Sequence, residues 1–366
     1  MIENRNLLIV TSEFPPEPGG IGNHAYSLAN QLAIHKFNVN VIADQRLVKT
    51  DTEFSFDQAQ KFNIVRVKLN KMRLLMYINR FIQVFKAVSK SEVVIASGKF
   101  SLWSVALATL FYRKKFIAVI HGTEVNYKKY YLRKSIDKSL KRFDKIIAVS
   151  SYTKSLIDYL NLQTVEVIPN GFNLPKEKNV EGKTIKGNPS LITVGSVTER
   201  KGQKNVILAL PEMLKTFPEL HYHIVGSPVE KENLLQLATD LNVNENITFY
   251  GIVSEKDKYE LLQGSTIFVM LSENTSSGDV EGFGIALLEA NNLKIPVIGA
   301  KGCGIEDAVN NNKSGILIDT KNHQEFVIAT QTIIDNYDCF KENSLDWSLK
   351  FTWEIIIRKY IKAINF

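Results

Sequence analysis

Short apolar runs alternate along the chain with longer segments in which apolar residues recur every three or four positions. The runs are rich in Val and Ile, which is typical of strands buried on both faces of a parallel sheet. In chain order, the predicted strands are 7–11, 39–43, 64–69, 93–96, 116–120, 146–149, 165–168, 191–195, 221–225, 247–250, 267–271, 296–299 and 315–318. The period of an amphipathic helix marks segments between them, for example 21–34, 205–217, 230–241 and 255–262. This alternation predicts an α/β fold built on doubly wound parallel sheets.

The alternation is interrupted between about Asn170 and Asn188, where the sequence is rich in Lys, Glu, Gly and Asn and shows no apolar period. We interpret this stretch as a linker, with one domain at 1–174 and a second at 188–345. A chain of 366 residues also favours two domains, since a domain usually holds about 100–200 residues. The last segment, 347–366, is amphipathic.

The composition is that of a soluble globular protein, with 45% hydrophobic and 23% charged residues. Two cysteines, Cys303 and Cys339, are too few for a disulfide framework and fit a reducing compartment. The longest apolar run, 102–111, is about half as long as a membrane span requires. Leu7 to Val10 is too short for the apolar core of a signal peptide. We therefore expect a cytoplasmic protein.

Basic residues are concentrated in the first half of the chain. Residues 1–174 contain 25 Lys and Arg against 13 Asp and Glu, whereas residues 175–366 contain 20 against 25. This asymmetry suggests that the basic half meets an anionic partner, such as a membrane surface, a lipid phosphate or an acidic glycan. A genome that favours Lys codons would give the same excess. The chain carries no motif of a nucleic-acid-binding protein, so we expect no nucleic-acid partner.

The segment 71–86 is both basic and strongly apolar. The residues that share one helical face are Leu74, Ile78, Phe81, Ile82 and Phe85. Two interpretations are open. The helix lies peripherally on an anionic membrane, helped by basic pairs further along the first domain, or it packs on the sheet of that domain.

The first predicted strand leads into the turn Phe14-Pro15-Pro16-Glu17-Pro18-Gly19-Gly20-Ile21-Gly22, and a helix is expected to begin near Ile21. Gly20 and Gly22 let the backbone approach a ligand, and the first amides of a helix bind anions without a charged side chain. The turn lacks the third glycine of the dinucleotide fingerprint G-x-G-x-x-G. A tight turn without a ligand is the alternative.

Two carboxylates, Glu281 and Glu289, stand eight residues apart in the second half of the chain. Glu281 belongs to a glycine-rich loop, and Glu289 is expected in the second turn of the following helix. The amides of Phe283, Gly284 and Ile285 would open that helix. One short segment thus offers amides for a diphosphate and carboxylates for the hydroxyl groups of a sugar and a ribose. The alternative is a capped helix with surface acids.

Two further turns follow predicted strands. Arg200 and Lys201 come after the strand that ends at Gly195, and both side-chain types bind phosphate well. His121 opens the sequence His-Gly-Thr-Glu directly after the strand 116–120. Ligands of doubly wound sheets bind at the carboxyl ends of strands, which makes His121 a candidate for ligand contact.

Together these motifs resemble glycosyltransferase family 4, the retaining glycosyltransferases with the GT-B fold, over nearly the whole chain. The segment Glu281–Glu289 is similar to the E-x7-E motif of that family, and Ile168–Gly171 and Phe351–Glu354 are similar to other parts of it. The context of Gly278–Gly282 looks most like the mannosyltransferases of the family. The resemblance implies two Rossmann-like domains facing a cleft, with a C-terminal helix, 350–366, that crosses back to the first domain.

The resemblance also implies a donor site, mainly on the C-terminal domain, for a nucleotide-diphosphate sugar. Glu289 would bind the ribose hydroxyls, Glu281 would contact sugar hydroxyls, and the amides of Phe283–Ile285 would lie near the diphosphate. Gly195 would also line the donor site.

The remaining roles concern the leaving diphosphate and the transferred sugar. Lys201 would stabilise the charge that builds on the diphosphate, and Gly20 and Gly22 would close over the same phosphates. His121 would touch the sugar near its 6-hydroxyl. Ser196 stands where the family usually has Arg, and Arg200 is the candidate substitute.

The loop Cys303 to Asp307 lacks the Pro that this family usually has there.

No D-x-D triplet, the usual metal-binding motif of metal-dependent glycosyltransferases, occurs in the chain. We therefore expect a metal-independent enzyme with no cofactor besides its donor substrate.

The expected function is transfer of a hexose, with GDP-mannose slightly favoured over UDP-sugars, to a glycan or lipid-linked acceptor in bacterial surface polysaccharide or glycolipid synthesis. The alternatives are a sugar-nucleotide epimerase of the same fold and a non-catalytic subunit that binds a nucleotide sugar.

Overall fold

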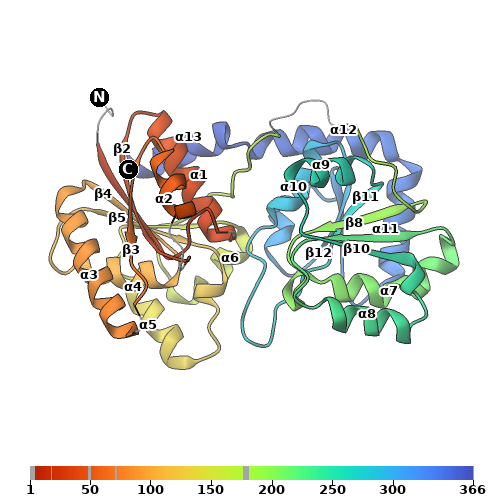
Figure 1. The fold of residues 1–366 in the computed structure, drawn as a ribbon, viewed down its shortest axis with the longest axis horizontal. Coiled ribbons are helices and arrows are strands. Elements are labelled where there is room, and N and C mark those ends of the chain that lie inside the picture. Colours follow the sequence, from red (N-terminus) through yellow and green to blue (C-terminus); the bar gives the residue numbers. More distant parts are fainter. Residues whose placement is uncertain (1–4, 18, 48–50, 71, 176–180, 366) are drawn as a thin grey trace. The chain divides into compact units, whose positions relative to one another are not determined.

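A computed structural model of the chain describes residues 5–17, 19–47, 51–70, 72–175 and 181–365, with the Arg73 side chain left out. The chain forms two compact units. The first comprises Met1–Gly171 and Trp353–Phe366, and the second comprises Phe172–Thr352. Each unit has a parallel sheet between layers of helices, as predicted (Figure 1).

The sheet of the first unit has the order β3-β2-β1-β4-β5-β6-β7 among the described residues. Its strands are β1 (Asn6–Thr11), β2 (Asn38–Asp44), β3 (Asn63–Val67), β4 (Val93–Ser97), β5 (Lys115–Ile120), β6 (Lys145–Ala148) and β7 (Val165–Val167). The order reverses at β1, so the turns after β1 and β4 lie at a topological switch point, where such sheets bind ligands.

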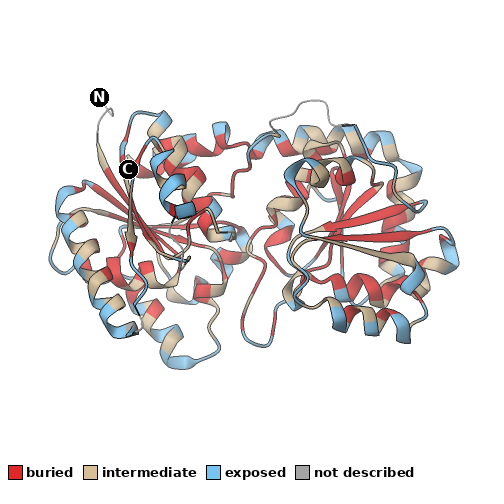
Figure 2. Ribbon diagram, viewed as in Figure 1, coloured by how far each residue is buried: buried red, intermediate tan, exposed pale blue. Residues whose placement is uncertain are grey.

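Helices cover both faces of this first sheet. The helices are α1 (Gly20–Ile34), α2 (Asp51–Gln58), α3 (Arg73–Lys90), α4 (Lys99–Ala108), α5 (Tyr130–Leu140), α6 (Ser151–Ser155) and α13 (Trp353–Ile364). Side chains of α3, α4 and α5 share a hydrophobic core with alternate residues of the strands, while α1 and α13 pack together on the other face. Buried residues run along the strands, and the outer faces of the helices are exposed (Figure 2).

The second unit has the strand order β10-β9-β8-β11-β12-β13. Its strands are β8 (Ser190–Val194), β9 (His221–Val225), β10 (Ile247–Gly251), β11 (Ile267–Met270), β12 (Val297–Ala300) and β13 (Gly315–Ile318). Its helices are α7 (Gln203–Thr216), α8 (Lys231–Asp240), α9 (Glu255–Gln263), α10 (Ile285–Asn292), α11 (His323–Asp335) and α12 (Tyr337–Ser348). Two hydrophobic clusters fill the two faces of this sheet.

The amphipathic segment at the C-terminus is broken into two helices. Helix α12 ends at Ser348, and α13 begins only at Trp353. At this break the backbone forms a β-bridge with the start of the second unit. The Phe172 amide donates to the Phe351 carbonyl at 3.0 Å, so this carbonyl is bonded outside the helix. Helix α13 belongs to the first unit, so the chain crosses back as predicted.

Helix α13 is anchored in the first unit by buried aromatic residues. Trp353 is 1% exposed, and the Tyr360 hydroxyl lies 2.9 Å from Nε2 of His24 on α1. A Cβ on Gly171 would lie 2.7 Å from Cδ2 of Trp353, so the indole packs directly on that backbone.

Helix α3 presents two kinds of apolar side chain. Phe81 and Phe85 pack on aromatic neighbours of the first unit, with ring centroids 5.9 Å and 5.5 Å from those neighbours. Leu74, Ile78 and Ile82 are 65%, 47% and 59% exposed. The predicted apolar face is therefore divided between the protein core and solvent. Within the described parts of the chain, no helix is long and apolar enough to cross a membrane.

Candidate functional site

A cluster of opposite charges joins two turns at the carboxyl edge of the second sheet. Nζ of Lys201 lies 2.8 Å from Oε2 of Glu281, and Nη1 of Arg200 contacts the same oxygen. Nε of Arg200 also lies 3.1 Å from Oδ2 of Asp279. The structure thus brings together three residues predicted for the site, Arg200, Lys201 and Glu281, and adds Asp279.

Close backbone contacts hold the cation turn in place. Arg200 and Lys201 lie in a 3₁₀ turn, Glu199–Lys201, which ends at Gly202 with a φ of +74°. A Cβ at Gly202 would lie 1.8 Å from the Leu271 carbonyl oxygen at the end of β11. Gly195, at the end of β8, faces the Lys201 side chain, since its Cβ would lie 3.6 Å from Cε of Lys201.

The loop that carries Glu281 is fixed by a second close approach. The Gly304 amide donates to the Glu281 carbonyl at 2.9 Å, and a Cβ at Gly304 would lie 2.0 Å from the Gly282 carbonyl oxygen. Glu281 is 8% exposed. Burial alone would raise its pKa, but Lys201 and Arg200 more than offset that effect and hold the pKa below its usual value. Glu281 is therefore an anion paired with two cations.

Helix α10 begins directly after this loop. Gly284 caps the helix with a φ of +89°, and Ile285 is its first residue. The Phe283 side chain is buried, and its ring centroid lies 5.9 Å from that of Phe351. The positive end of the helix dipole therefore lies next to Glu281, as a diphosphate site requires.

Glu289 lies in the second turn of α10, where it was predicted. Its Oε2 is 3.8 Å from Nζ of Lys258 on α9, which also binds Glu255 at 2.8 Å. Burial raises the pKa of Glu289, and the nearby Lys258 counteracts this effect only in part. The partly buried carboxylate makes no close ion pair in the described structure, and it can accept hydrogen bonds from vicinal hydroxyls.

A polar pocket of about 300 Å³ adjoins the charge cluster. Its lining residues are Ser272, Glu273, Asn274, Lys301, Gly302, Cys303, Thr320 and Lys321. The Glu273 amide donates to the Arg200 carbonyl at 3.1 Å, which ties the pocket wall to the cation turn. The Ser272 hydroxyl is buried and has no hydrogen-bond partner among the residues that the structure describes.

In the first unit, the glycine turn leads into α1, which begins at Gly20 close to the predicted start. A Cβ at Gly22 would lie 3.0 Å from the Glu13 and Phe14 backbone, so this glycine serves the packing of the turn. A Cβ at Gly20 would meet nothing within 4 Å, and the backbone there is open to a ligand.

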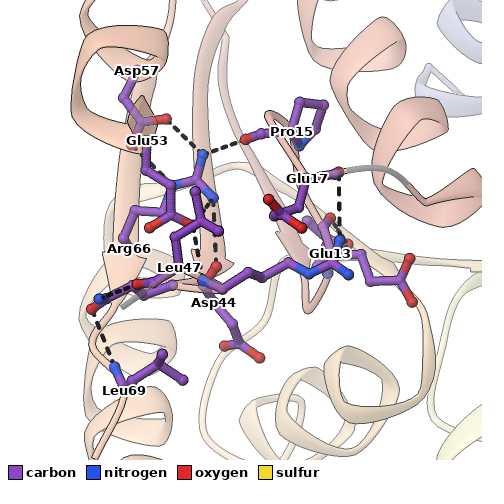
Figure 3. Close-up of polar contacts among 12 residues, drawn as sticks. Glu13, Pro15, Glu17, Asp44, Leu47, Glu53, Asp57, Arg66 and Leu69 are labelled. Carbon is purple, nitrogen blue, oxygen red and sulfur yellow. Dashed lines mark hydrogen bonds and ion pairs between the residues drawn. The ribbon is translucent and has the colours of Figure 1, made fainter. Parts of the chain in front are cut away.

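Arg66 at the end of β3 anchors the glycine turn (Figure 3). Its guanidinium donates to the Pro15 carbonyl and makes a two-point contact with Asp57, at 2.9 and 2.7 Å. Glu53 accepts from Arg66 at 3.3 Å and from the Arg46 amide at 2.8 Å. A charged and largely buried network of hydrogen bonds therefore joins the glycine turn to the edge of the sheet.

His121 lies at the end of β5, half-buried, with Nε2 2.9 Å from the Ser97 hydroxyl. Its ring centroid is 5.0 Å from that of His24. Burial lowers the pKa of His121 to about 4, so the ring is neutral at pH 7. The neighbouring Glu124 accepts from the His121 amide at 2.6 Å, and burial raises the pKa of Glu124 to about 7. A neutral imidazole is suited to hydrogen bonding with a hydroxyl group.

Sequence reasoning missed Asp279, Lys258, Glu124 and Arg66 as parts of these clusters. Asp279 belongs to the segment Gly278–Gly282, and Glu124 belongs to the sequence His-Gly-Thr-Glu. Each is an acid two or three residues from a predicted site residue, and this spacing was the signal that could have identified it. Lys258 and Arg66 gave no signal, because each meets its partner only through the tertiary fold.

The structure also bears on metal binding and thiol chemistry. Among the residues that the structure describes, no group of three His, Cys, Asp or Glu side chains could hold a metal ion. Burial raises the pKa of Cys303 to about 12, which leaves its thiol protonated and unreactive.

Two family models match adjoining parts of the chain. Residues 175–346 match the model described as glycosyl transferases group 1, and residues 18–176 match the model described as Glycosyltransferase Family 4. The chain belongs to glycosyltransferase family 4. It is a nucleotide-sugar transferase with the GT-B type of fold.

Curated relatives of this glycosyltransferase include mannosyltransferases. A protein of Corynebacterium glutamicum is 26% identical over 84% of this chain and 84% of its own length, and is named GDP-mannose-dependent monoacylated alpha-(1-6)-phosphatidylinositol monomannoside mannosyltransferase. A protein of Mycobacterium tuberculosis, named GDP-mannose-dependent alpha-(1-6)-phosphatidylinositol monomannoside mannosyltransferase, is 25% identical over 91% of this chain and 90% of its own length.

Solved structures share the fold of this glycosyltransferase at low sequence identity. HepE of Anabaena, crystallised with UDP and glucose, has a TM-score of 0.79 and 17% identity, covering 99% of this chain and 100% of HepE. A glycosyltransferase of Rickettsia africae has a TM-score of 0.77 and 20% identity, covering 99% of this chain and 98% of that one.

Proposed function

We propose that this glycosyltransferase is a retaining hexosyltransferase that uses GDP-mannose and a glycan or lipid-linked acceptor in bacterial surface polysaccharide or glycolipid synthesis. The observation that carries this proposal is the convergence of Arg200, Lys201 and Glu281 at the start of α10, with Glu289 one turn further on. Cations, a helix N-terminus and two carboxylates match the diphosphate, sugar and ribose of such a donor.

In this mechanism the diphosphate leaves toward Arg200 and Lys201. Their positive charge and the dipole of α10 stabilise the negative charge that builds on the leaving oxygen. The acceptor hydroxyl attacks from the same face of the sugar, and the departing diphosphate takes its proton. Charge neutralisation is assigned to protein cations, so no metal ion is required.

Polar side chains are proposed to orient the sugar. Glu281 accepts from sugar hydroxyls once the diphosphate occupies the two cations. The unpartnered Ser272 hydroxyl offers another contact. His121, neutral at pH 7 and bonded to Ser97, is proposed to bind near the 6-hydroxyl.

Mannose and a glycolipid acceptor are favoured by the names of the curated relatives. UDP-sugars remain the competing donors, since HepE was crystallised with UDP and glucose.

A transfer assay tests the proposed reaction. Purified protein is incubated with radiolabelled GDP-mannose or UDP-glucose and a bacterial lipid extract, and label in the organic phase is measured. We expect an α-linked product from one donor, and a rate reduced about 100- to 1,000-fold in Lys201→Met, the loss typical when one charge-stabilising donor is removed. Donor turnover without an acceptor would instead indicate an epimerase. Binding without turnover, with extracts of several bacteria, would indicate a non-catalytic subunit.

We also propose peripheral contact between the first unit and an anionic membrane on the cytoplasmic side. Its support is the exposure of Leu74, Ile78 and Ile82 on α3 together with the basic charge of residues 1–174. The protein should sediment with phosphatidylglycerol vesicles at low salt, and less with phosphatidylcholine vesicles. Ile78→Glu with Ile82→Glu should reduce sedimentation, whereas Ile328→Glu, a 57% exposed control on α11, should not. Equal sedimentation of all variants would contradict the assignment.

A further inference from the structure

The cation turn offers phosphate only two positive side chains, Arg200 and Lys201. The residues between them and β8 are Gly195, Ser196, Val197, Thr198 and Glu199, which contain no cation. Lys201 points along Gly195, close to the sheet edge. Arg200 is the residue whose direction must be set by something outside its own turn, because an Arg side chain has many rotamers.

Two carboxylates of one loop bind different nitrogen atoms of the Arg200 guanidinium. Asp279 accepts from Nε at 3.1 Å, and Glu281 accepts from Nη1. The Arg200 side chain is only 24% exposed, and Glu281 has 10% exposure, whereas Asp279 lies nearer the surface at 44%. The plane of the guanidinium is fixed by these contacts.

Asp279 itself is held on a well-bonded turn. Its amide donates to the Thr275 hydroxyl at 3.0 Å, and its carbonyl accepts from the Thr275 amide at 2.9 Å. The Gly278 amide donates to the Thr275 carbonyl at 3.0 Å, and Gly278 has a φ of +92°. The Asp279 carboxylate therefore does not depend on a ligand for its position.

A bound anion would displace the contacts of Glu281 but not the contact of Asp279. Oε2 of Glu281 lies on both cations, in the place that a phosphate oxygen would take. Asp279 contacts the Nε edge of Arg200, away from Nη1 and Lys201. A guanidinium has five donors, so Asp279 can keep its contact while the Nη groups bind phosphate.

We propose that Asp279 is the positioning residue of the diphosphate site. It orients Arg200 toward the β-phosphate of the donor, while the diphosphate replaces Glu281 as the partner of Arg200 and Lys201. This rests on the proposed function, since it takes a nucleotide diphosphate as the ligand. Phosphate binding then frees the Glu281 carboxylate for sugar hydroxyls, so the diphosphate and sugar parts of the donor are bound cooperatively.

The sign of the effect of Asp279→Asn separates positioning from simple electrostatics. Removing a negative charge near an anion site should strengthen binding if only Coulomb repulsion matters. Loss of positioning should instead weaken binding. Glu199→Gln is the matched control, because it removes the same charge from the residue next to Arg200 without an Arg200 contact shown in the structure.

The experiment is a calorimetric titration of the full chain with GDP, UDP, GMP and UMP. We expect Asp279→Asn to weaken diphosphate binding about tenfold and monophosphate binding much less, while Glu199→Gln leaves affinity equal or higher. In an Arg200→Ala background, Asp279→Asn should weaken diphosphate binding no further. With Arg200 present, Asp279→Glu should lose less diphosphate affinity than Asp279→Asn, because it keeps a carboxylate at this position. Thermal unfolding of each variant shows whether the fold is kept.

Equal or tighter diphosphate binding by Asp279→Asn would overturn the positioning role, as would equal losses in the wild-type and Arg200→Ala backgrounds. Failure of the wild-type protein to bind either diphosphate would overturn the proposed function itself, so the two failures are distinguishable.

Discussion

Substituting Gly202 by Ala tests whether backbone packing fixes the two cations of the donor site. Gly202 has a φ of +74°, and its added Cβ would lie 1.8 Å from the Leu271 oxygen, 2.2 Å from the Leu271 carbon and 2.8 Å from the Ser272 nitrogen. All three are backbone atoms at the end of β11, so no side-chain rotation relieves the contact. Either the cation turn or the end of β11 must move.

The expected cost has two parts. A left-handed backbone costs Ala about 1–2 kcal/mol, and overpacking of a well-packed site adds about 1–3 kcal/mol. Gly251→Ala is a matched control, since Gly251 has a φ of +71° and its added Cβ would meet nothing within 4 Å. The control should show the first cost alone, and Gly202→Ala should show both.

Urea unfolding monitored by circular dichroism measures these costs, with the two units allowed separate transitions. Calorimetry with GDP and UDP then reports on the cations, and Gly202→Ala should weaken nucleotide binding more than Gly251→Ala does. If the two variants lost the same stability and bound nucleotide equally well, the packing of the cation turn on β11 would not be what positions Arg200 and Lys201.

Three further outcomes are expected. Trp353→Ala should destabilise the first unit by about 3–5 kcal/mol, as large buried aromatic truncations do, and leave the transition of the second unit in place; a shift of both transitions would contradict this division. Because the pKa of His121 is lowered to about 4, the unfolded state binds its proton more readily, so the His121 contribution to stability should fall as pH drops from about 6.5 toward 4, by up to about 1.4 kcal/mol per unit. Glu124, whose pKa is raised to about 7, contributes with the opposite sign in that window, and buried His24 with the same sign as His121. His121→Asn should therefore make urea stability fall less, or rise more, than that of the wild type as pH drops from about 6.5 to 4. A thiol reagent at pH 8 should label exposed Cys339 quickly and buried Cys303 only on unfolding.

The strands could be predicted from the sequence almost completely, because runs buried on both faces leave an unbroken apolar pattern. Each predicted strand lies within two residues of an observed one. The break of the last amphipathic segment between Ser348 and Trp353 could not be predicted. It depends on the bridge to Phe172, which lies far away in sequence.

The candidate site was predictable where its residues share one segment. Glu281, the start of α10 and Glu289 are such a case, because loop and helix positions follow from local spacing. The pairing of Arg200 with Asp279, of Lys258 with Glu289 and of Arg66 with Asp57 follows only from tertiary contacts. Charge alone does not reveal which of many acids a given cation meets.

The most direct test of a donor site on the second unit is a calorimetric titration of GDP and UDP into the wild-type protein and Glu289→Ala. We expect saturable binding of at least one nucleotide, weakened about tenfold or more by loss of the carboxylate, since hydrogen bonds to a charged group contribute about 1.5–3 kcal/mol. Glu342→Ala, an exposed control in the same unit, should bind like the wild type. Absence of binding, or equal affinity in Glu289→Ala and the wild type, would contradict the assignment of the donor site to the segment Glu281–Glu289.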